Sequence, residues 1–203
     1  MDEAKLKLLQ GAEALFMRYG FKSITMDDIS REMGISKKTL YQYFTDKHDL
    51  VNQAVENHLG TEQQYCLDLV KNEKDPIAFL LAISNNFGDE AKHINTAVLF
   101  DLRKYFKEAW DKIDAYSKEF IYGQILQNLI DGKAKGLYRS DINERVIALY
   151  YVNMVHFMVN PENYQKEVRD FHIVHQALVM YHLRGILTDK GLKQLEKLQN
   201  NNQ

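Results

Sequence analysis

The sequence predicts an all-α protein of about nine helices, and two observations support this fold class. Only two prolines, Pro76 and Pro161, occur among the 203 residues. The long segments between them repeat apolar residues at spacings of three and four, the period of a helix that packs on one side. A chain of this length has room for a small N-terminal domain followed by a larger one.

The first two helices are predicted from their end signals. The first is expected over about residues 3–19. Thr25 and Asp28 then form a capping box, in which the Thr25 hydroxyl accepts a bond from one amide and the Asp28 carboxylate accepts from another. The helix that follows is short, and Gly34 fits the left-handed position just past its end. A second short helix must therefore begin close behind it.

The third helix is the most informative stretch of the chain. Ser36 caps it, and only Leu40 and Phe44, four residues apart, resemble core anchors. The other side chains up to Lys47 are mainly lysine, threonine, glutamine and tyrosine. A helix with so few packing residues and so many hydrogen-bonding groups presents a surface, and that surface suits duplex DNA. Residues 25–44 therefore match a helix-turn-helix.

An ordered set of residues between positions 5 and 55 extends this pattern. The set comprises Ala12, Phe16, Gly20, Thr25, Asp28, Ile29, Met33, Gly34, Ile35, Ser36, Thr39, Leu40, Tyr41, Tyr43, Phe44, Lys47 and Leu50. It resembles the N-terminal domain of TetR-family transcriptional regulators. Lys38 stands where the family often has glycine, and Ser30 where it often has alanine. The resemblance implies a homeodomain-like DNA-binding domain at residues 1–47 and an effector-binding and dimerisation domain at 48–203.

Eight side chains form the predicted DNA-binding set. They are Thr25, Lys37, Lys38, Thr39, Tyr41, Gln42, Tyr43 and Lys47. Phosphate contacts position a protein on DNA, whereas base contacts specify the sequence. We assign the tyrosines and Lys47 to phosphates, in agreement with the resemblance, and add Thr25 as a further phosphate contact from the start of its helix. The others are assigned to bases, because lysine suits guanine, glutamine suits adenine and the threonine methyl suits thymine.

Less specific roles remain open for four of these residues. Tyr41 and Tyr43 have ordinary packing as their alternative. The alternative for Lys37 and Lys38 is a solvated helix start, although cations there oppose the helix dipole. That unfavourable placement favours the functional interpretation for both lysines.

The charge balance is weak for a DNA-binding protein. The formal net charge is -2 at pH 7. Between Arg18 and His48, six basic residues stand against four acidic ones. Local potential matters more than net charge for docking. We therefore expect tight binding only from a dimer, with a moderate dependence on salt.

The remaining helices are predicted from periodicity and breakers. They are expected at about 47–72, 76–89, 95–105, 107–135, 141–158 and 164–187, and the chain is expected to fray after Lys193. Asp46, Asp75 and Asp141 are the expected caps or first residues of three of them. The last helix carries more apolar surface than one exposed helix should. The resemblance implies that the last two helices form a four-helix homodimer interface, which predicts a palindromic operator of double-stranded DNA.

The resemblance also implies an effector cavity among the fifth to eighth helices. The predicted pocket residues are Asn86, Phe87, Phe100, Trp110, Phe120, Asn153, His156 and Phe157. Most aromatic residues in this region are expected to be core. A largely apolar pocket with a few polar groups would take a small hydrophobic or amphipathic effector. Such a ligand would shift the dimer between DNA-fitting and non-fitting spacings of its recognition helices.

Several classes of protein are disfavoured. The sequence has no Gly-rich phosphate loop, paired-carboxylate constellation or nucleophile elbow, so we expect no enzyme and no cofactor. His172, His175 and His182 have helical spacing but no acidic or cysteine partner nearby in sequence, so we expect no metal. A single cysteine, Cys66, fits a reducing cytoplasm. The longest apolar stretch, 146–159, is too short to cross a membrane, and no signal peptide is evident at the start.

Together these features predict a homodimeric, ligand-responsive DNA-binding transcriptional regulator. In this family such a protein is most often a repressor that a small molecule releases from its operator. Two alternatives stay open: a helical small-molecule-binding protein or enzyme whose helix-turn-helix is only scaffold, and an architectural DNA-binding protein without an effector. Tyr41 and Lys47 argue against the first, because a scaffold would not need them. A solid, aromatic-filled core without a cavity would favour the second.

Overall fold

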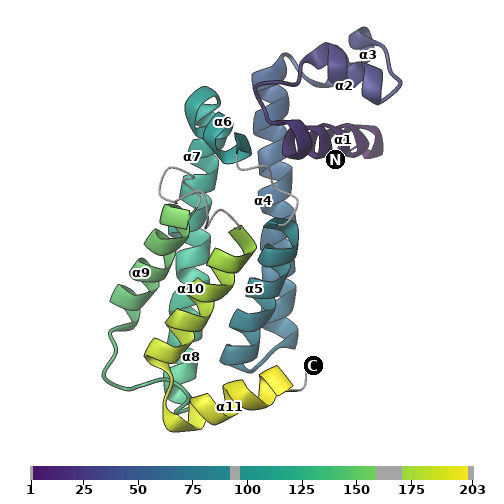
Figure 1. The fold of residues 1–203 in the computed structure, drawn as a ribbon. Helices are drawn as coiled ribbons and strands as arrows, with labels where there is room; N and C mark the ends of the chain where they lie inside the picture. Colours follow the sequence, from purple (N-terminus) through teal and green to yellow (C-terminus); the bar gives the residue numbers. More distant parts are fainter. Residues whose placement is uncertain (1, 92–96, 159–170, 201–203) are drawn as a thin grey trace. The chain divides into compact units, whose positions relative to one another are not determined.

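The computed structural model describes residues 2–91, 97–158 and 171–200; at residues 87–91, 97, 158, 171 and 172 it describes the backbone alone. In these ranges the chain is helical, apart from turns, loops and an isolated bridge between Tyr138 and Leu187 (Figure 1). The predicted all-α class is therefore confirmed. No helix within these ranges has both the length and the apolar character that a membrane span requires.

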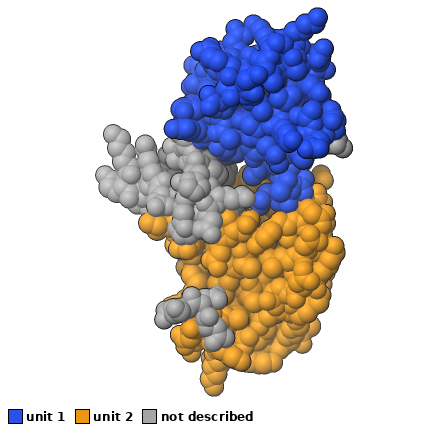
Figure 2. Space-filling model, turned by 90° about the vertical axis from the view of Figure 1, so that its right-hand side faces the viewer, with its two compact units in different colours: residues 1–62, 93–115 blue, residues 63–92, 116–203 orange. Residues whose placement is uncertain are grey.

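The chain divides into two compact units, coloured blue and orange in Figure 2. Unit 1 comprises residues 1–62 and 93–115, and unit 2 comprises residues 63–92 and 116–203. Each unit has its own apolar core. This division by compactness does not test the functional boundary predicted after residue 47, which stays a prediction.

Unit 1 contains the N-terminal helices together with a later pair. Its helices are α1 (Glu3–Tyr19), α2 (Met26–Glu32), α3 (Lys37–Tyr43), the first part of α4 (Lys47–Asn72), α6 (Ala97–Tyr105) and most of α7 (Lys107–Tyr116). Phe16, Ile29 and Leu40 are completely buried in the shared core. Because each of these side chains comes from a different helix, the first three helices pack as one body.

The later helices of unit 1 pack against the N-terminal ones through two kinds of contact. The buried carboxylate of Asp101 on α6 accepts a 2.9 Å hydrogen bond from the backbone amide of Lys22. The ring of Phe106 lies 5.9 Å from that of Phe21 and 4.8 Å from that of His48. The loop after α1 and the start of α4 are therefore held by α6 and the residue that follows it.

Unit 2 is built from the other helices. They are the rest of α4, α5 (Pro76–Ala91), the π-helix η1 (Ser117–Ile121), α8 (Tyr122–Ala134), α9 (Glu144–Met158), α10 (Phe171–Ile186) and α11 (Asp189–Asn200). Ile77, Leu129 and Leu183 are completely buried in its core. The single helix predicted at 107–135 is thus interrupted by a π-helical turn.

A buried polar network connects the start of α5 to α8. The Asn128 amide donates a 2.9 Å hydrogen bond to the Pro76 carbonyl, and the Tyr138 hydroxyl donates to the Asn128 side-chain oxygen at 3.0 Å. Burial raises the pKa of Tyr138 well above its usual value, so the phenol stays protonated and able to donate. The Tyr138 ring lies so close to Gly132 that a β-carbon there would meet it at 2.0 Å. Only glycine fits at that position.

Two predicted features of the C-terminal region are wrong. Asp141 does not cap α9: it pairs with Arg139 at 2.6 Å, and the Asn143 side chain accepts the Val146 amide instead. Residues 194–200 do not fray either, because they belong to α11, which continues to Asn200, while residues 201–203 of the predicted tail lie outside the described residues. Leu195 of α11 is buried in the core of unit 2. The start of the ninth predicted helix, residues 164–170, lies outside the described residues, as do residues 95 and 96.

Candidate nucleic-acid interface

The geometry of the helix-turn-helix follows its predicted end signals. The Asp28 amide donates to the Thr25 hydroxyl at 3.2 Å, and the Thr25 amide donates to the Asp28 carboxylate at 3.0 Å. Gly34 has a φ of +65°, in the left-handed region. The Thr39 amide donates to the Ser36 hydroxyl at 3.0 Å. Two short helices are thereby fixed at their starts and at the turn between them.

One side of α3 packs and the other is exposed. Leu40 is completely buried and Phe44 is 1% exposed, as the anchor prediction requires. Lys38, Tyr41 and Gln42 are exposed. The outward side therefore offers ammonium, phenol and amide groups to a partner, which are the groups that contact phosphates and base edges.

The two tyrosines of α3 differ in their surroundings. Tyr41 is 44% exposed. Tyr43 is partly buried against the core of unit 1, and its ring centre lies 6.4 Å from that of Phe44. Tyr41 is therefore open to a partner, whereas part of the Tyr43 ring is used for packing. The phosphate roles of both residues stay predictions.

The predicted threonine contacts are engaged in caps. The Thr25 hydroxyl lies 2.6 Å from the Asp28 carboxylate, to which it donates. The Thr39 hydroxyl lies 2.8 Å from that of Ser36. Both hydroxyls retain acceptor lone pairs, and the Thr39 methyl group remains suited to a thymine contact.

Lys47 is held close to the protein surface. Its ammonium donates a 3.2 Å hydrogen bond to the Lys22 carbonyl and lies 5.6 Å from the Phe106 ring centre. Desolvation lowers the pKa of Lys47, an effect that the nearby carboxylates of Asp101 and Asp28 oppose. The first turn of α4 thus places this cation beside the loop before α2, where a phosphate contact would join the two segments.

Lys37 has a partner that the sequence analysis missed. Its ammonium lies 2.7 Å from a carboxylate oxygen of Asp27 on α2 and 5.9 Å from the Tyr41 ring centre. The hydrogen bond and charge of Asp27 raise the pKa of Lys37. From the sequence, Asp27 was considered only as one of the acidic residues that lower the local charge. Its position two residues after the Thr25 cap was the one sequence feature that could have indicated a role in this site.

The predicted ligand-pocket residues fall in both units. Phe100 and Trp110 belong to unit 1, where Trp110 packs against the core and Phe100 is 38% exposed. The other six belong to unit 2: Asn86, Phe87, Phe120, Asn153, His156 and Phe157. Among them, Phe120 is partly buried against the core, while Asn153 and Phe157 are exposed; the Phe87 side chain lies outside the described residues. Their predicted common role is not tested by this placement.

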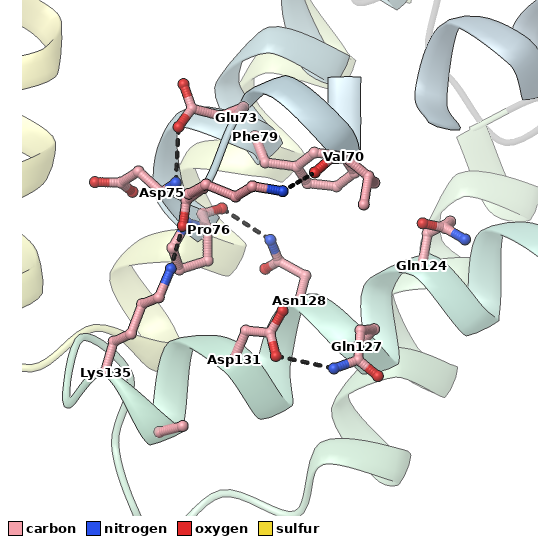
Figure 3. A pocket seen from close by; sticks show the side chains of 12 residues that line it. Val70, Glu73, Asp75, Pro76, Phe79, Gln124, Gln127, Asn128, Asp131 and Lys135 are labelled. Carbon is pink, nitrogen blue, oxygen red and sulfur yellow. Dashed lines mark hydrogen bonds between the residues drawn. The ribbon is translucent and has the colours of Figure 1, made fainter. Parts of the chain in front are cut away.

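A pocket of about 410 Å³ lies elsewhere in unit 2, between the end of α4, the start of α5 and α8 (Figure 3). Its lining combines apolar, amide and charged side chains: Val70, Glu73, Lys74, Asp75, Pro76, Phe79, Gln124, Gln127, Asn128, Asp131, Ala134 and Lys135. None of the eight predicted pocket residues is among them. Several lining groups bond to one another, as Gln127 does to Asp131 at 2.9 Å.

Helices α9 and α10 expose apolar side chains. These residues, the α9–α10 apolar set, are Val146, Leu149, Tyr150, Met154, Phe157, Ile173 and Tyr181. Tyr181 is 75% exposed and Tyr150 61%. The two helices contact each other within unit 2. So many large apolar side chains on neighbouring helices are characteristic of an interaction surface.

Comparisons with known proteins agree with this geometry. Residues 8–54 match the family model described as bacterial regulatory proteins, tetR family. The chain is 29% identical over 188 residues to the uncharacterized HTH-type transcriptional regulator YvaF of Bacillus subtilis, an alignment covering 91% of this chain and 96% of YvaF. It is 26% identical over 125 residues to the icaADBC negative transcriptional regulator IcaR of Staphylococcus aureus, covering 60% and 61% of the two chains.

Solved structures share the fold. A transcriptional regulator from Cytophaga hutchinsonii aligns with a TM-score of 0.73 at 15% identity, covering 92% of this chain and all of the other. A TetR-family regulator from Agrobacterium tumefaciens aligns with a TM-score of 0.72 at 21% identity, covering 92% and 99%. These relatives are transcriptional regulators, a class without enzymatic function. The predicted resemblance to TetR-family regulators is therefore confirmed: residues 8–54 match the tetR family model, and the relatives named here are HTH-type transcriptional regulators.

Proposed function

We propose that the protein is a homodimeric repressor that binds a palindromic DNA operator and is released by a small molecule. The observation that carries the DNA-binding part is α3, which buries only Leu40 among its seven residues and exposes two lysines, a tyrosine and a glutamine. The repressor assignment is supported by similarity to IcaR, whose name describes a negative regulator. A repressor acts by occupying DNA, so it needs tight and specific binding.

The dimer is proposed to form through α9 and α10. The α9–α10 apolar set would be buried by the same set of a second copy, because a twofold interface brings one surface against itself. Two copies related in this way present two α3 helices to one face of the duplex. Their half-sites would then lie about 34 Å apart, and the operator would read the same on both strands.

The effector is proposed to be small and amphipathic or hydrophobic. Neighbouring structures of this fold include a transcriptional regulator from Saccharomonospora viridis in complex with choline and a SmeT–triclosan complex. Unit 2 offers the pocket of Figure 3, where Val70, Pro76 and Phe79 supply apolar surface beside amide and charged groups. Its volume lies within the range of pockets that hold small ligands.

The operator proposal is tested by selecting random duplexes on the purified full chain and sequencing those retained. We expect a palindromic consensus with half-sites about one helical turn apart. Retention without any sequence preference would contradict the proposal and favour the architectural alternative.

The effector proposal is tested by a thermal-shift screen with hydrophobic and cationic compounds, followed by operator release. Two matched amide variants locate the site: Asn86→Ala in the predicted set and Gln124→Ala in the pocket of Figure 3, both at half-buried positions. Loss of the ligand-induced shift in only one of them identifies the site. If no compound both stabilises the protein and releases DNA, the ligand-responsive part of the proposal fails.

A further inference from the structure

Asp27, Lys37 and Tyr41 form a cluster across the two helices of the helix-turn-helix. The Asp27 carboxylate lies 2.7 Å from the Lys37 ammonium, and the ammonium lies 5.9 Å from the Tyr41 ring centre. The Asp27 and Lys37 side chains are 58% and 57% exposed. The cluster therefore occupies the same outward surface as the groups that are predicted to meet DNA.

This ion pair is poorly explained by stability. Exposed ion pairs contribute little to folding, because water screens the charges and both side chains lose freedom. Lys37 is also the first residue of α3, where a cation opposes the helix dipole. What the pair does is hold the ammonium at one place and set a negative charge beside it.

The effect of that negative charge depends on the partner group. Phosphates are negatively charged and offer only acceptors. The Asp27 carboxylate therefore repels them and weakens the attraction of Lys37 for DNA of any sequence. A G·C pair in the major groove offers both complements: guanine O6 and N7 accept from lysine, and the cytosine N4 amino group donates to a carboxylate. A carboxylate and an ammonium held side by side match that base pair in both charge and hydrogen bonding.

We propose that Asp27 is a specificity-determining residue that acts with Lys37 to read one G·C pair in each half-site. This inference rests on the proposed DNA-binding function. Asp27 selects for the base pair in two ways, by accepting from cytosine and by keeping Lys37 from serving as a general phosphate contact. Lys37 supplies the affinity for guanine.

The test compares Asp27→Asn with Glu32→Gln in the full chain. Both residues are exposed on α2 and both changes remove one negative charge, but Glu32 is not the ion-pair partner of Lys37. Binding to the selected operator and to a scrambled duplex of equal length is measured over a series of salt concentrations. We expect Asp27→Asn to lower the operator-to-scrambled affinity ratio about tenfold. Its salt slope on scrambled DNA should steepen by about one for each bound domain.

The control and a third variant decide the outcome. Glu32→Gln should leave the affinity ratio within about twofold of wild type. Lys37→Gln should relax selection at the same base pair as Asp27→Asn. In that background Asp27→Asn should lower the affinity ratio by less than it does in the wild type and should no longer steepen the salt slope, because only the cytosine contact remains to be lost. Circular dichroism melts confirm that each variant is folded before binding is compared.

The inference and the function beneath it fail in different ways. A wild-type protein without preference for any duplex would overturn the proposed function and this inference with it. If the Asp27→Asn variant keeps the operator preference as fully as the Glu32→Gln variant does, the inference alone is overturned. So would relaxation of different base pairs by Asp27→Asn and Lys37→Gln.

Discussion

Two exposed surfaces of this protein differ in chemistry. Helix α3 exposes Lys38, Tyr41 and Gln42, while α9 and α10 expose Tyr150, Tyr181 and other large apolar side chains. Both helical regions bury one side in a core of the same kind. The two regions therefore differ in how favourably their outer sides interact with water when no partner is bound.

Water hydrates the outer side of α3 well, so that surface can be stable without DNA and bind it reversibly. The α9–α10 apolar set has no such compensation, because exposed apolar surface is unfavourable in water and favours association. The α3 surface thus suits a partner that binds reversibly, depending on salt and sequence. The α9–α10 surface suits a partner that stays bound. The following predictions test that distinction, from the largest expected effect to the smallest.

A charge placed in the α9–α10 apolar set should have the largest effect. Tyr150→Asp would bury two carboxylates in the proposed dimer, one from each copy, and should weaken self-association by about a thousandfold. Ile130→Asp is the matched control, since Ile130 is 44% exposed but lies on α8. Sedimentation equilibrium measures both. If the two variants have equal dimer dissociation constants, the assignment of α9 to the interface is wrong.

Removing an anchor from the inner side of α3 should come next. Leu40 is completely buried, so Leu40→Ala should lower the free energy of unfolding of unit 1 by about 3 kcal/mol. Gln42→Ala on the exposed side should change it by less than about 0.5 kcal/mol. Denaturant unfolding followed by circular dichroism distinguishes them. A similar loss from both changes would mean that α3 is not divided into an inner and an outer side.

The inner side of α10 should show a pH dependence. His182 packs against the Tyr151 ring at 5.0 Å, and burial lowers its pKa to about 4. The unfolded chain takes up this proton near pH 6.5, so stability is complete above that pH and falls as the pH drops toward 4. The expected loss at pH 5 is about 2 kcal/mol. In thermal or denaturant melts, His182→Leu should flatten the dependence of stability on pH. If stability falls as steeply with pH in the variant as in the wild type, other groups cause the dependence.

Two changes on the DNA-facing surface should have smaller and contrasting effects. Lys47→Gln should weaken binding to the operator and to scrambled DNA alike, by about tenfold, and should reduce the salt slope. Gln42→Ala should mainly alter the ranking of operator sequences, by about tenfold at one base pair. Fluorescence anisotropy titrations on both duplexes measure the two effects. If the variants behave alike, the division into phosphate and base contacts is incorrect.

The sequence was most informative where an interaction joins near neighbours. Thr25 with Asp28, Ser36 with Thr39 and the left-handed Gly34 were all predictable, because each involves atoms within a few residues of one another. The anchors Leu40 and Phe44 followed from helical spacing. Together these local signals located the helix-turn-helix and the outward side of its second helix.

Contacts between distant residues were not predictable in this way. Helix α11 looks too polar to fold alone, yet the Gln194 amide donates to the Asp75 carboxylate at 2.7 Å. Its Gly191 approaches the Leu137 carbonyl so closely that a β-carbon would lie 2.3 Å from it. The pocket of Figure 3 likewise brings α4, α5 and α8 together, and nothing in their separate sequences marks it.

By itself, then, the sequence determined the all-α class, the caps of the helix-turn-helix and the residues of α3 that stand outward, since these depend on spacing along one helix. Only the tertiary structure decided that α11 is ordered, that Lys47 bonds to the Lys22 carbonyl, and that Asp27 stands beside Lys37. The physical reason is the same in each case. A hydrogen bond or ion pair between two elements depends on how those elements pack, and packing is a property of the whole core rather than of either segment.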